Sequence, residues 1–324
     1  MGENNPFPDL FAGGRRRSFA VLVAAGLGQG GLLAGMALLM KSGLDRAFAG
    51  ADAPASASAI LLFAALSLGA ALAGGLKWLA HVEAERFGHS YAHALRMRLL
   101  RKVVAAGAPP KARRAAVLLR VSGDVTPLRL WVSRGLSQLI VGGLTITLAI
   151  AGLALIDWAI AAAVGVTLAA ASIAALSLTR RLGDKTAETR RRRGQFANAA
   201  DRSISAAQEP KSAHSLRDER RRLRRVSRRV RDAHLDRAAY TGALRAIAES
   251  GGALAGVAAM AVGAGLTAGG SLSPGSVMSA VFLAGVLAPH AQAVSRSLEY
   301  WTAAVVARRK QRELFDGLAV SSDD

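Results

Sequence analysis

Apolar residues alternate with charged ones in blocks rather than singly, and each apolar block is about 20 residues long, enough to cross a ~30 Å hydrocarbon core at 1.5 Å per residue. Each block is expected to be a helix, because an isolated strand in lipid would leave its backbone groups unpaired. The sequence therefore predicts an all-α membrane protein with six transmembrane helices, over 19–40, 59–80, 136–156, 158–178, 246–268 and 277–310.

Two long polar segments, after the second and fourth spans, are also predicted to be largely helical. Apolar residues recur every four positions in the first and at helical spacing in the second, which places them on one face of a helix. These stripes are Phe87, Tyr91, Leu95, Leu99 and Val103, then Leu216, Leu223, Val226, Val230 and Ala233. Breaks at 107–110 and 208–210 divide each segment into a helix leading out, a short turn or crosswise helix, and a helix leading back. Arms of about 25 residues would project about 35–40 Å from the bilayer.

The distribution of Lys and Arg predicts the orientation. Of the 42 Lys and Arg residues, all but Lys41, Arg46 and the near-end Lys77 lie in the segments on one side of the spans. Cytoplasmic segments carry the excess of basic residues. We therefore expect a multi-pass protein of the inner (plasma) membrane, with both termini and both long loops in the cytoplasm. The tails are predicted at 1–17 and 317–324, and the helical domain at 18–316.

The start of the chain has a second interpretation. Arg16-Arg17-Ser18-Phe19 before an apolar run resembles a twin-arginine export signal, with Ala47-Phe48-Ala49 as a cleavage site. The run is longer than a usual signal core and five more spans follow it, so a retained first helix is expected.

Composition narrows the chemistry. The chain has no cysteine, which excludes disulfides, thiolate metal sites and a cysteine nucleophile. The net charge of +20 and the arginine-rich stretch 217–231 suggest nucleic acid, but that stretch carries an apolar stripe and no aromatic side chains on which bases would stack. Contact with anionic lipid headgroups explains the charge more simply, so anionic lipids are the expected partners and nucleic acid is not.

Polar residues within the spans are the candidates for a substrate pathway, because they are costly in lipid. They are Gln29, Gln138, Arg245, Glu249, His290, Gln292, Arg296 and Glu299.

These candidates have structural interpretations too. Arg245 and Glu249 stand four apart, which predicts an ion pair near the interface, the alternative being a charge that selects substrate in a cavity. Gln29 and Gln138 are expected to hydrogen-bond between helices. His290 is expected to be a satisfied interior histidine, because no second ligand stands at metal spacing.

One face of the last span is polar. Its residues, spaced three or four apart, are Pro289, Gln292, Arg296 and Glu299. A polar stripe of this kind indicates a water-filled cavity, with helix packing and interfacial snorkelling as the alternatives.

Short outside turns and two long helical inside loops resemble the transmembrane domain of an exporter-type ABC transporter. Local sequence agrees over about residues 15–316. The stretch 119–129 resembles the family's Gly-Asp-Val segment before the third helix, and residues 191–229 its arginine-rich return arm. The last span resembles the family's sixth helix through Pro274-Gly275-Ser276-Val277, Pro289 and Arg308-Arg309.

The resemblance implies an ABC ATPase partner and a second transmembrane subunit, as a homodimer or heterodimer. No Gly-x-x-x-x-Gly-Lys-Ser/Thr loop occurs in the chain, so we expect no catalytic site or bound cofactor here, with ATP and magnesium on the partner. The chain stops at Asp324, where a nucleotide-binding domain would follow in many relatives. The implied coupling residues are Pro109, Pro110, Lys111, Arg113, Gln208, Glu209, Pro210, Lys211 and His214.

The leading hypothesis is therefore half of the translocation pathway of an ATP-driven exporter. A regulatory or scaffolding membrane protein with the same fold is the alternative, and an unrelated secondary carrier is a third. A cavity holding both Arg and Glu, with few aromatics, would suit lipids, peptides or small amphiphiles.

Overall fold

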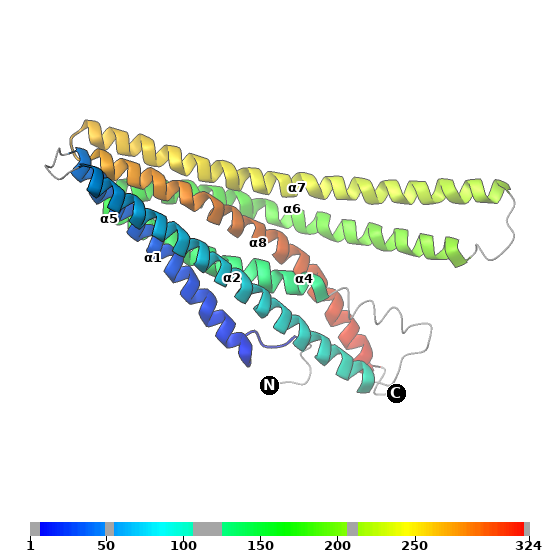
Figure 1. The fold of residues 1–324 in the computed structure, drawn as a ribbon. Helices are drawn as coiled ribbons and strands as arrows, with labels where there is room; N and C mark the ends of the chain where they lie inside the picture. The colour runs from blue at the N-terminus through cyan, green and yellow to red at the C-terminus, as the bar shows by residue number, and fades with distance from the viewer. Residues whose placement is uncertain (1–6, 49–54, 106–124, 206–212, 321–324) are drawn as a thin grey trace.

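The computed structural model describes residues 7–48, 55–105, 125–205 and 213–320, and all regular elements in these ranges are helices (Figure 1). The helices are α1 (Gly14–Phe48), α2 (Ala55–Ala105), α4 (Val125–Leu130), the π-helical η1 (Trp131–Leu136), α5 (Ser137–Ile156), α6 (Trp158–Ser205), α7 (Ala213–Ala268) and α8 (Pro274–Val320). Six of the resulting helical stretches are long and apolar enough to cross a membrane, as the sequence predicts.

The helices form two groups that lie together at one end and diverge toward the other. In Figure 1, α6 and α7 run side by side as one long pair, and α1, α2, α4 and the far part of α8 spread away from it. The helix α8 joins the groups, since it packs against both α7 and α5. The beginning of α1 and the end of α8 lie at the diverging end of the second group.

Short connections bring successive spans together at the converging end. Asp157 is extended, with φ −162° and ψ 134°, and so ends α5. Its carboxylate accepts hydrogen bonds from the backbone N–H groups of Ala159 and Ile160, at 2.8 and 3.1 Å, and thereby caps α6. Between α7 and α8, Gly270 takes a left-handed φ of 72°, and Pro274 begins the next helix.

The long polar segments are helical where the structure describes them. The helix α2 continues past its apolar span to Ala105, and α6 continues to Ser205, while α7 begins at Ala213, far ahead of its own span. At 1.5 Å per residue, the polar arms of α6 and α7 are about 40 and 50 Å long. The predicted turns within 106–124 and 206–212 lie outside the described residues.

The two predicted apolar stripes differ in burial. In the arm of α2, Phe87, Leu95 and Leu99 are fully buried, and Tyr91 nearly so. In the arm of α7 only Ala233 is buried, and Leu216 is exposed. The difference arises because the α2 arm packs against α4, η1 and α8, whereas the α7 arm has α6 as its main neighbour.

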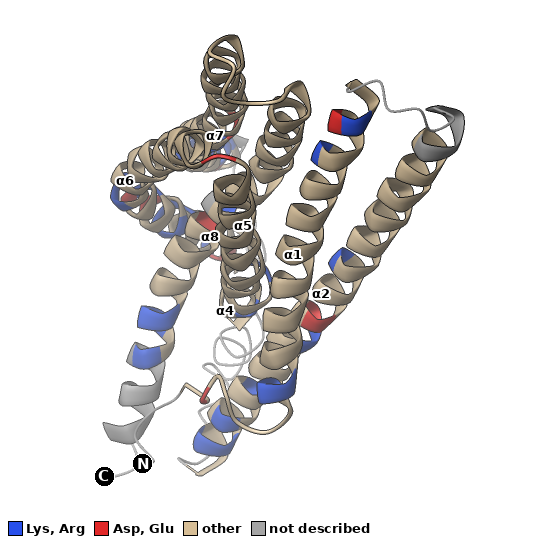
Figure 2. Cartoon of the chain, turned by 90° about the vertical axis from the view of Figure 1, so that its left-hand side faces the viewer, with Lys and Arg blue, Asp and Glu red and all other residues tan. Residues whose placement is uncertain are grey.

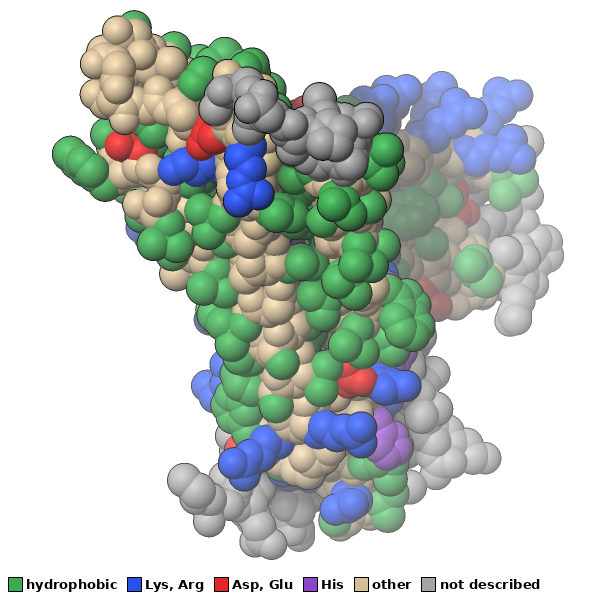
Figure 3. Space-filling view, turned by 60° about the vertical axis from the view of Figure 1, so that its left-hand side comes forward, with side chains coloured by type: hydrophobic (Ala, Val, Ile, Leu, Met, Phe, Trp, Pro, Cys, Tyr) green, Lys and Arg blue, Asp and Glu red, His purple; other side chains and the backbone are tan. Residues whose placement is uncertain are grey.

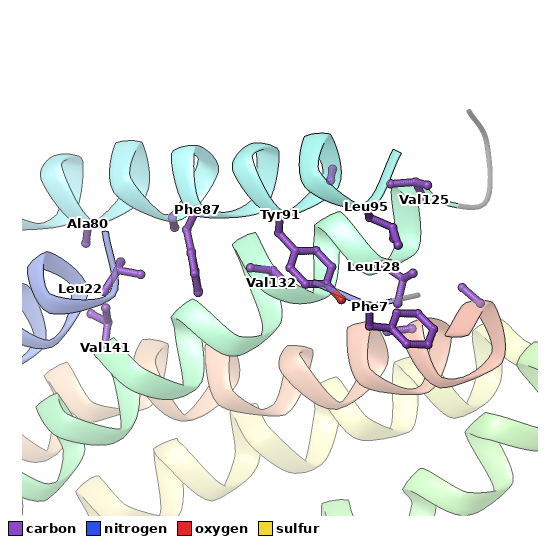
Figure 4. Close-up of a cluster of buried hydrophobic side chains, with 14 of the residues drawn as sticks. Phe7, Leu22, Ala80, Phe87, Tyr91, Leu95, Val125, Leu128, Val132 and Val141 are labelled. Atoms are coloured by element: carbon purple, nitrogen blue, oxygen red, sulfur yellow. The ribbon is translucent and has the colours of Figure 1, made fainter. Parts of the chain in front are cut away.

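The buried stripe of α2 forms a core with α4, η1 and the start of the chain. Figure 4 shows Tyr91 and Leu95 facing Leu128, with Phe7 beside them. The backbone carbonyl of Phe7 accepts a hydrogen bond of 2.9 Å from Arg98. The described segment before α1, residues 7–13, is thus attached to the arm of α2 at Phe7.

Charged side chains are concentrated away from the middle of the spans. Figure 2 shows Lys and Arg on α1, α2 and α8 mostly toward the end of the molecule at which α1 begins, with a few at the opposite end of α1. The face in Figure 3 has a broad band of hydrophobic side chains and backbone between two charged zones. Within α2, large side chains such as Leu61 and Phe63 are more than two-thirds exposed, as expected for helices surrounded by lipid.

Candidate functional site

A cavity of about 510 Å³ lies among four helical segments, in the half of the spans next to the polar arms. Its walls come from α1, α2, the η1–α5 segment and α8. Its polar lining residues are Gln29, Lys77, His81, Ser133, Arg134, Ser137, Gln138, His290, Arg296 and Tyr300. The site therefore combines residues from both ends of the sequence.

Three buried polar atoms in the cavity wall have no hydrogen-bond partner in the structure. They are Nε2 of Gln29, Oγ of Ser133 and Nε2 of His290, on three different helices. These residues are only 2%, 2% and 7% exposed. A buried polar group without a partner costs about 1–3 kcal/mol, so three of them around one cavity indicate a site adapted to a polar ligand or to water.

The charges that line the cavity are all basic. Lys77, Arg134 and Arg296 contribute to the described lining, and it contains no Asp or Glu. Arg134 is neutralised in part by Glu85, at 3.3 Å, which also pairs with Arg129 at 3.1 Å. Lys77 and Arg296 make no ion pair with any described residue. The described lining therefore carries a net positive charge.

The π-helical segment places two of the lining residues. The backbone N–H of Ser137 bonds to the carbonyl of Val132, five residues back, and the Ser137 hydroxyl donates to the same oxygen at 2.9 Å. A single wide turn of this kind is common at functional sites. Here it precedes α5 and carries Ser133 and Arg134 into the cavity wall.

Glycine allows α2 to lie close against this segment. A Cβ on Gly88 would come within 2.6 Å of the Ser133 Cβ and 3.1 Å of the Arg129 carbonyl oxygen. Gly30 of α1 allows a similar close approach to α5, since a Cβ on it would lie 2.7 Å from the Leu148 Cβ. Glycine thus permits close packing of two of the helix pairs that contribute to the cavity wall.

Four of the eight predicted pathway residues line this cavity: Gln29, Gln138, His290 and Arg296. Glu249 is exposed on α7 and Gln292 is half-buried on α8, and neither belongs to the lining. The polar stripe of the last span is thus divided, because Arg296 faces the cavity and Glu299 faces α7.

The prediction of an ion pair between Arg245 and Glu249 is wrong. Arg245 instead binds Glu299 of α8 through two hydrogen bonds, Nε to Oε1 at 3.2 Å and Nη2 to Oε2 at 3.3 Å. The sequence spacing allows the local pair, but α7 packs against α8 and brings a less exposed carboxylate within reach.

Two other structural interpretations need correction. His290 is not a satisfied interior histidine, because its Nε2 is buried without a partner. Gln29 makes no interhelical hydrogen bond through Nε2 for the same reason. Both side chains face a space rather than a neighbouring polar group. In the described part of the chain, no three His, Asp or Glu side chains are grouped to hold a metal ion.

Sequence reasoning missed six polar lining residues: Lys77, His81, Ser133, Arg134, Ser137 and Tyr300. Lys77 had a signal, since it is the one charge in the second apolar block, but it was interpreted as an end-of-span residue. His81, Ser133 and Arg134 lie just outside the predicted spans, where polar residues are ordinary, and Ser137 and Tyr300 lie within predicted spans but were not singled out.

Most of the predicted coupling residues lie outside the described ranges. Pro109, Pro110, Lys111 and Arg113 fall in 106–124, and Gln208, Glu209, Pro210 and Lys211 fall in 206–212. His214 is the second residue of α7.

The arms that lead to the second of these turns are attached to each other and to the membrane helices. Lys185 of α6 pairs with Asp236 of α7 at 2.6 Å, and this hydrogen bond raises the pKa of Lys185. The hydroxyl of Thr189 donates to the Ala233 carbonyl at 3.0 Å. Arg190 of α6 donates to the Ala303 carbonyl of α8 at 3.0 Å, which connects the arm with the helix that lines the cavity.

Comparison with known proteins agrees with this architecture. The model of a protein family described as the ABC transporter transmembrane region matches residues 19–290. A search of curated proteins finds no match.

Proposed function

The chain belongs to the ABC transporter transmembrane family, and on that basis we propose that it is the membrane-spanning subunit of an ATP-driven exporter. It would form half of the translocation pathway and be driven by a nucleotide-binding subunit in trans. The fold is that of the exporter-type transmembrane domain, with six apolar helices and no strand in the described residues.

The observation that carries the proposal is the pair of long helical arms formed by α6 and α7. They continue far beyond the apolar spans and are held to each other by Lys185–Asp236 and Thr189–Ala233. Ordering each backbone unit costs about 1–2 kcal/mol of conformational entropy. Because long polar arms would bear this cost without a return if they were idle, we infer that they have a mechanical role.

Arms of this kind would transmit motion from a motor to the membrane. An ATPase partner, with ATP and magnesium bound to it, would dock near 109–116 and 204–214. Its closure on nucleotide would displace the arm tips, and the Arg190–Ala303 hydrogen bond would pass that displacement to α8 and the cavity.

A second transmembrane subunit would complete the pathway. The apolar span of α2 supports this, because only 6% of it is buried within this chain. A partner subunit and lipid would share that surface.

Coupling can be tested without knowledge of the substrate, because the chain has no native cysteine. A single Arg296→Cys substitution provides a label in the cavity wall, and its reaction rate with a water-soluble maleimide reports the shape of the cavity. In the complex with its ATPase, we expect this rate to differ between the nucleotide-free state and the state trapped with ATP and vanadate.

Replacing Glu209-Pro210-Lys211 by three glycines should abolish that difference while ATP hydrolysis and membrane insertion persist. The matched control replaces Ser271-Leu272-Ser273, at the opposite end of α7, and should retain the difference. If no ATPase co-purifies, or if the first variant responds to nucleotide as before, the transporter proposal fails and a regulatory or scaffolding role replaces it.

Orientation is tested by reporter fusions. We propose that both termini and both arms are cytoplasmic, which the excess of Lys and Arg at that end supports. Fusions at Gly50, Asp157 and Ser271 should report the outside, and fusions at Lys111 and Asp324 the inside. An inside signal at Ser271 would contradict six spans.

A further inference from the structure

We propose that the cavity between α1, α2, η1–α5 and α8 binds the anionic headgroup, a phosphate or carboxylate, of an amphiphile. The inference rests on the proposed function, because the bound molecule would be the transported substrate. It narrows the substrate class, which the sequence left open among lipids, peptides and small amphiphiles, to amphiphiles with an anionic headgroup.

The first argument is the sign of the charge. Lys77 and Arg296 line the cavity from α2 and α8 and have no acidic partner among the described residues. A cation near the hydrocarbon region is costly unless an opposite charge or water compensates it. Glu299, which the sequence placed beside Arg296, is occupied by Arg245 and absent from the lining. An anion entering the cavity would therefore meet two uncompensated cations and no repelling carboxylate.

The second argument is independent of charge and rests on the unpartnered buried atoms. Gln29 Nε2 is a donor, Ser133 Oγ can donate, and His290 Nε2 donates in one tautomer. They reach the same cavity from α1, η1 and α8. Oxygen acceptors of a headgroup would satisfy all of them, and phosphate and carboxylate oxygens are the strongest acceptors available.

The remaining wall is apolar and fits a hydrocarbon chain rather than a ring. Leu22, Ala80, Ala84, Val141 and Ala293 line it, and Tyr300 is the one Phe, Tyr or Trp side chain of the described lining. The volume of about 510 Å³ lies in the range of small-molecule sites. A flat aromatic ligand would find few stacking partners, and a cationic amphiphile would meet repulsion.

Native mass spectrometry of the full chain, released from a neutral detergent, tests the proposal, because each bound molecule is resolved by mass. The probes are dodecyl phosphate, dodecyltrimethylammonium and dodecanol, which share one alkyl chain and differ in head charge. We expect one dodecyl phosphate per chain at concentrations where the other two do not bind.

Variants assign the binding to this cavity. Lys77→Gln and Arg296→Gln should each weaken dodecyl phosphate binding on the order of tenfold, since each removes a charge-assisted hydrogen bond. Gln29→Leu should weaken it several-fold without altering charge. Lys41→Gln, which removes a cation from the other end of α1, should leave it unchanged. Equal binding of the three probes, or tight phosphate binding that survives both charge variants, would overturn the proposal.

Two further binding measurements identify the source of the anion. If phosphatidylglycerol binds with the same variant dependence, the ligand is a membrane lipid; if only dodecyl phosphate does, it is a water-soluble amphiphile. The nucleotide-dependent labelling described above separates the two proposals. If dodecyl phosphate does not bind but the labelling rate still depends on nucleotide, only the proposed ligand class is overturned. If dodecyl phosphate binds but the labelling rate does not depend on nucleotide, only the proposed transporter function is overturned.

Discussion

The ion pair between Arg245 and Glu299 gives an asymmetric prediction for stability. The two side chains are joined by two hydrogen bonds at 3.2 and 3.3 Å, but their surroundings differ. The Arg245 side chain is 62% exposed, whereas that of Glu299 is 13% exposed. Removing one partner therefore leaves a solvated guanidinium in one case and a shielded carboxylate in the other.

The expected magnitudes follow from that difference. Glu299→Gln should lower the free energy of unfolding by about 0–1 kcal/mol, the usual contribution of an exposed ion pair, because the Arg245 side chain can extend to water. Arg245→Gln should cost about 1–3 kcal/mol, since the carboxylate loses its charged donor while it stays largely buried. The double variant should have about the same free energy of unfolding as Glu299→Gln, because it leaves no buried carboxylate without a charged partner.

The assay is equilibrium unfolding of the chain in mixed micelles, titrated with sodium dodecyl sulfate. The double-mutant cycle gives the coupling free energy between the two side chains directly. Equal losses for the two single variants, or a larger loss for Glu299→Gln, would refute the reasoning and mean that the burial of Glu299 does not govern the pair.

Three further predictions use the same preparation. Phe87→Ala should lower the free energy of unfolding by about 3–5 kcal/mol, because Phe87 is fully buried in the arm of α2, whereas the exposed Phe63→Ala should change it little. Gly88→Val should destabilise by about 1–3 kcal/mol or shift η1 measurably, because its Cβ would overlap Ser133. Under maleimide, Arg296→Cys should react much faster than Gln292→Cys, because Arg296 lines the cavity and Gln292 does not; equal rates would place both on one aqueous face.

The sequence by itself determined the helices and their division into spans and arms. The apolar blocks, the period-four stripe of Phe87, Tyr91 and Leu95, and the breaks between predicted spans at Asp157 and after residue 268 are all local signals, and each has its counterpart in the structure. Helix formation in lipid is decided by runs of about 20 residues, so a local pattern is sufficient.

Only the tertiary structure decided which polar side chains meet. The periodicity placed Arg296 and Glu299 on one face, yet they face different neighbours, and Arg245 bonds across to α8 rather than along its own helix. Ser133 and Arg134 reach the cavity because a π-helical turn precedes α5, and Lys77 reaches it because of how α2 lies against its neighbours. These outcomes depend on the rotation and spacing of packed helices, which are set by contacts between residues far apart in the chain, and a pattern that repeats every few residues carries no information about them.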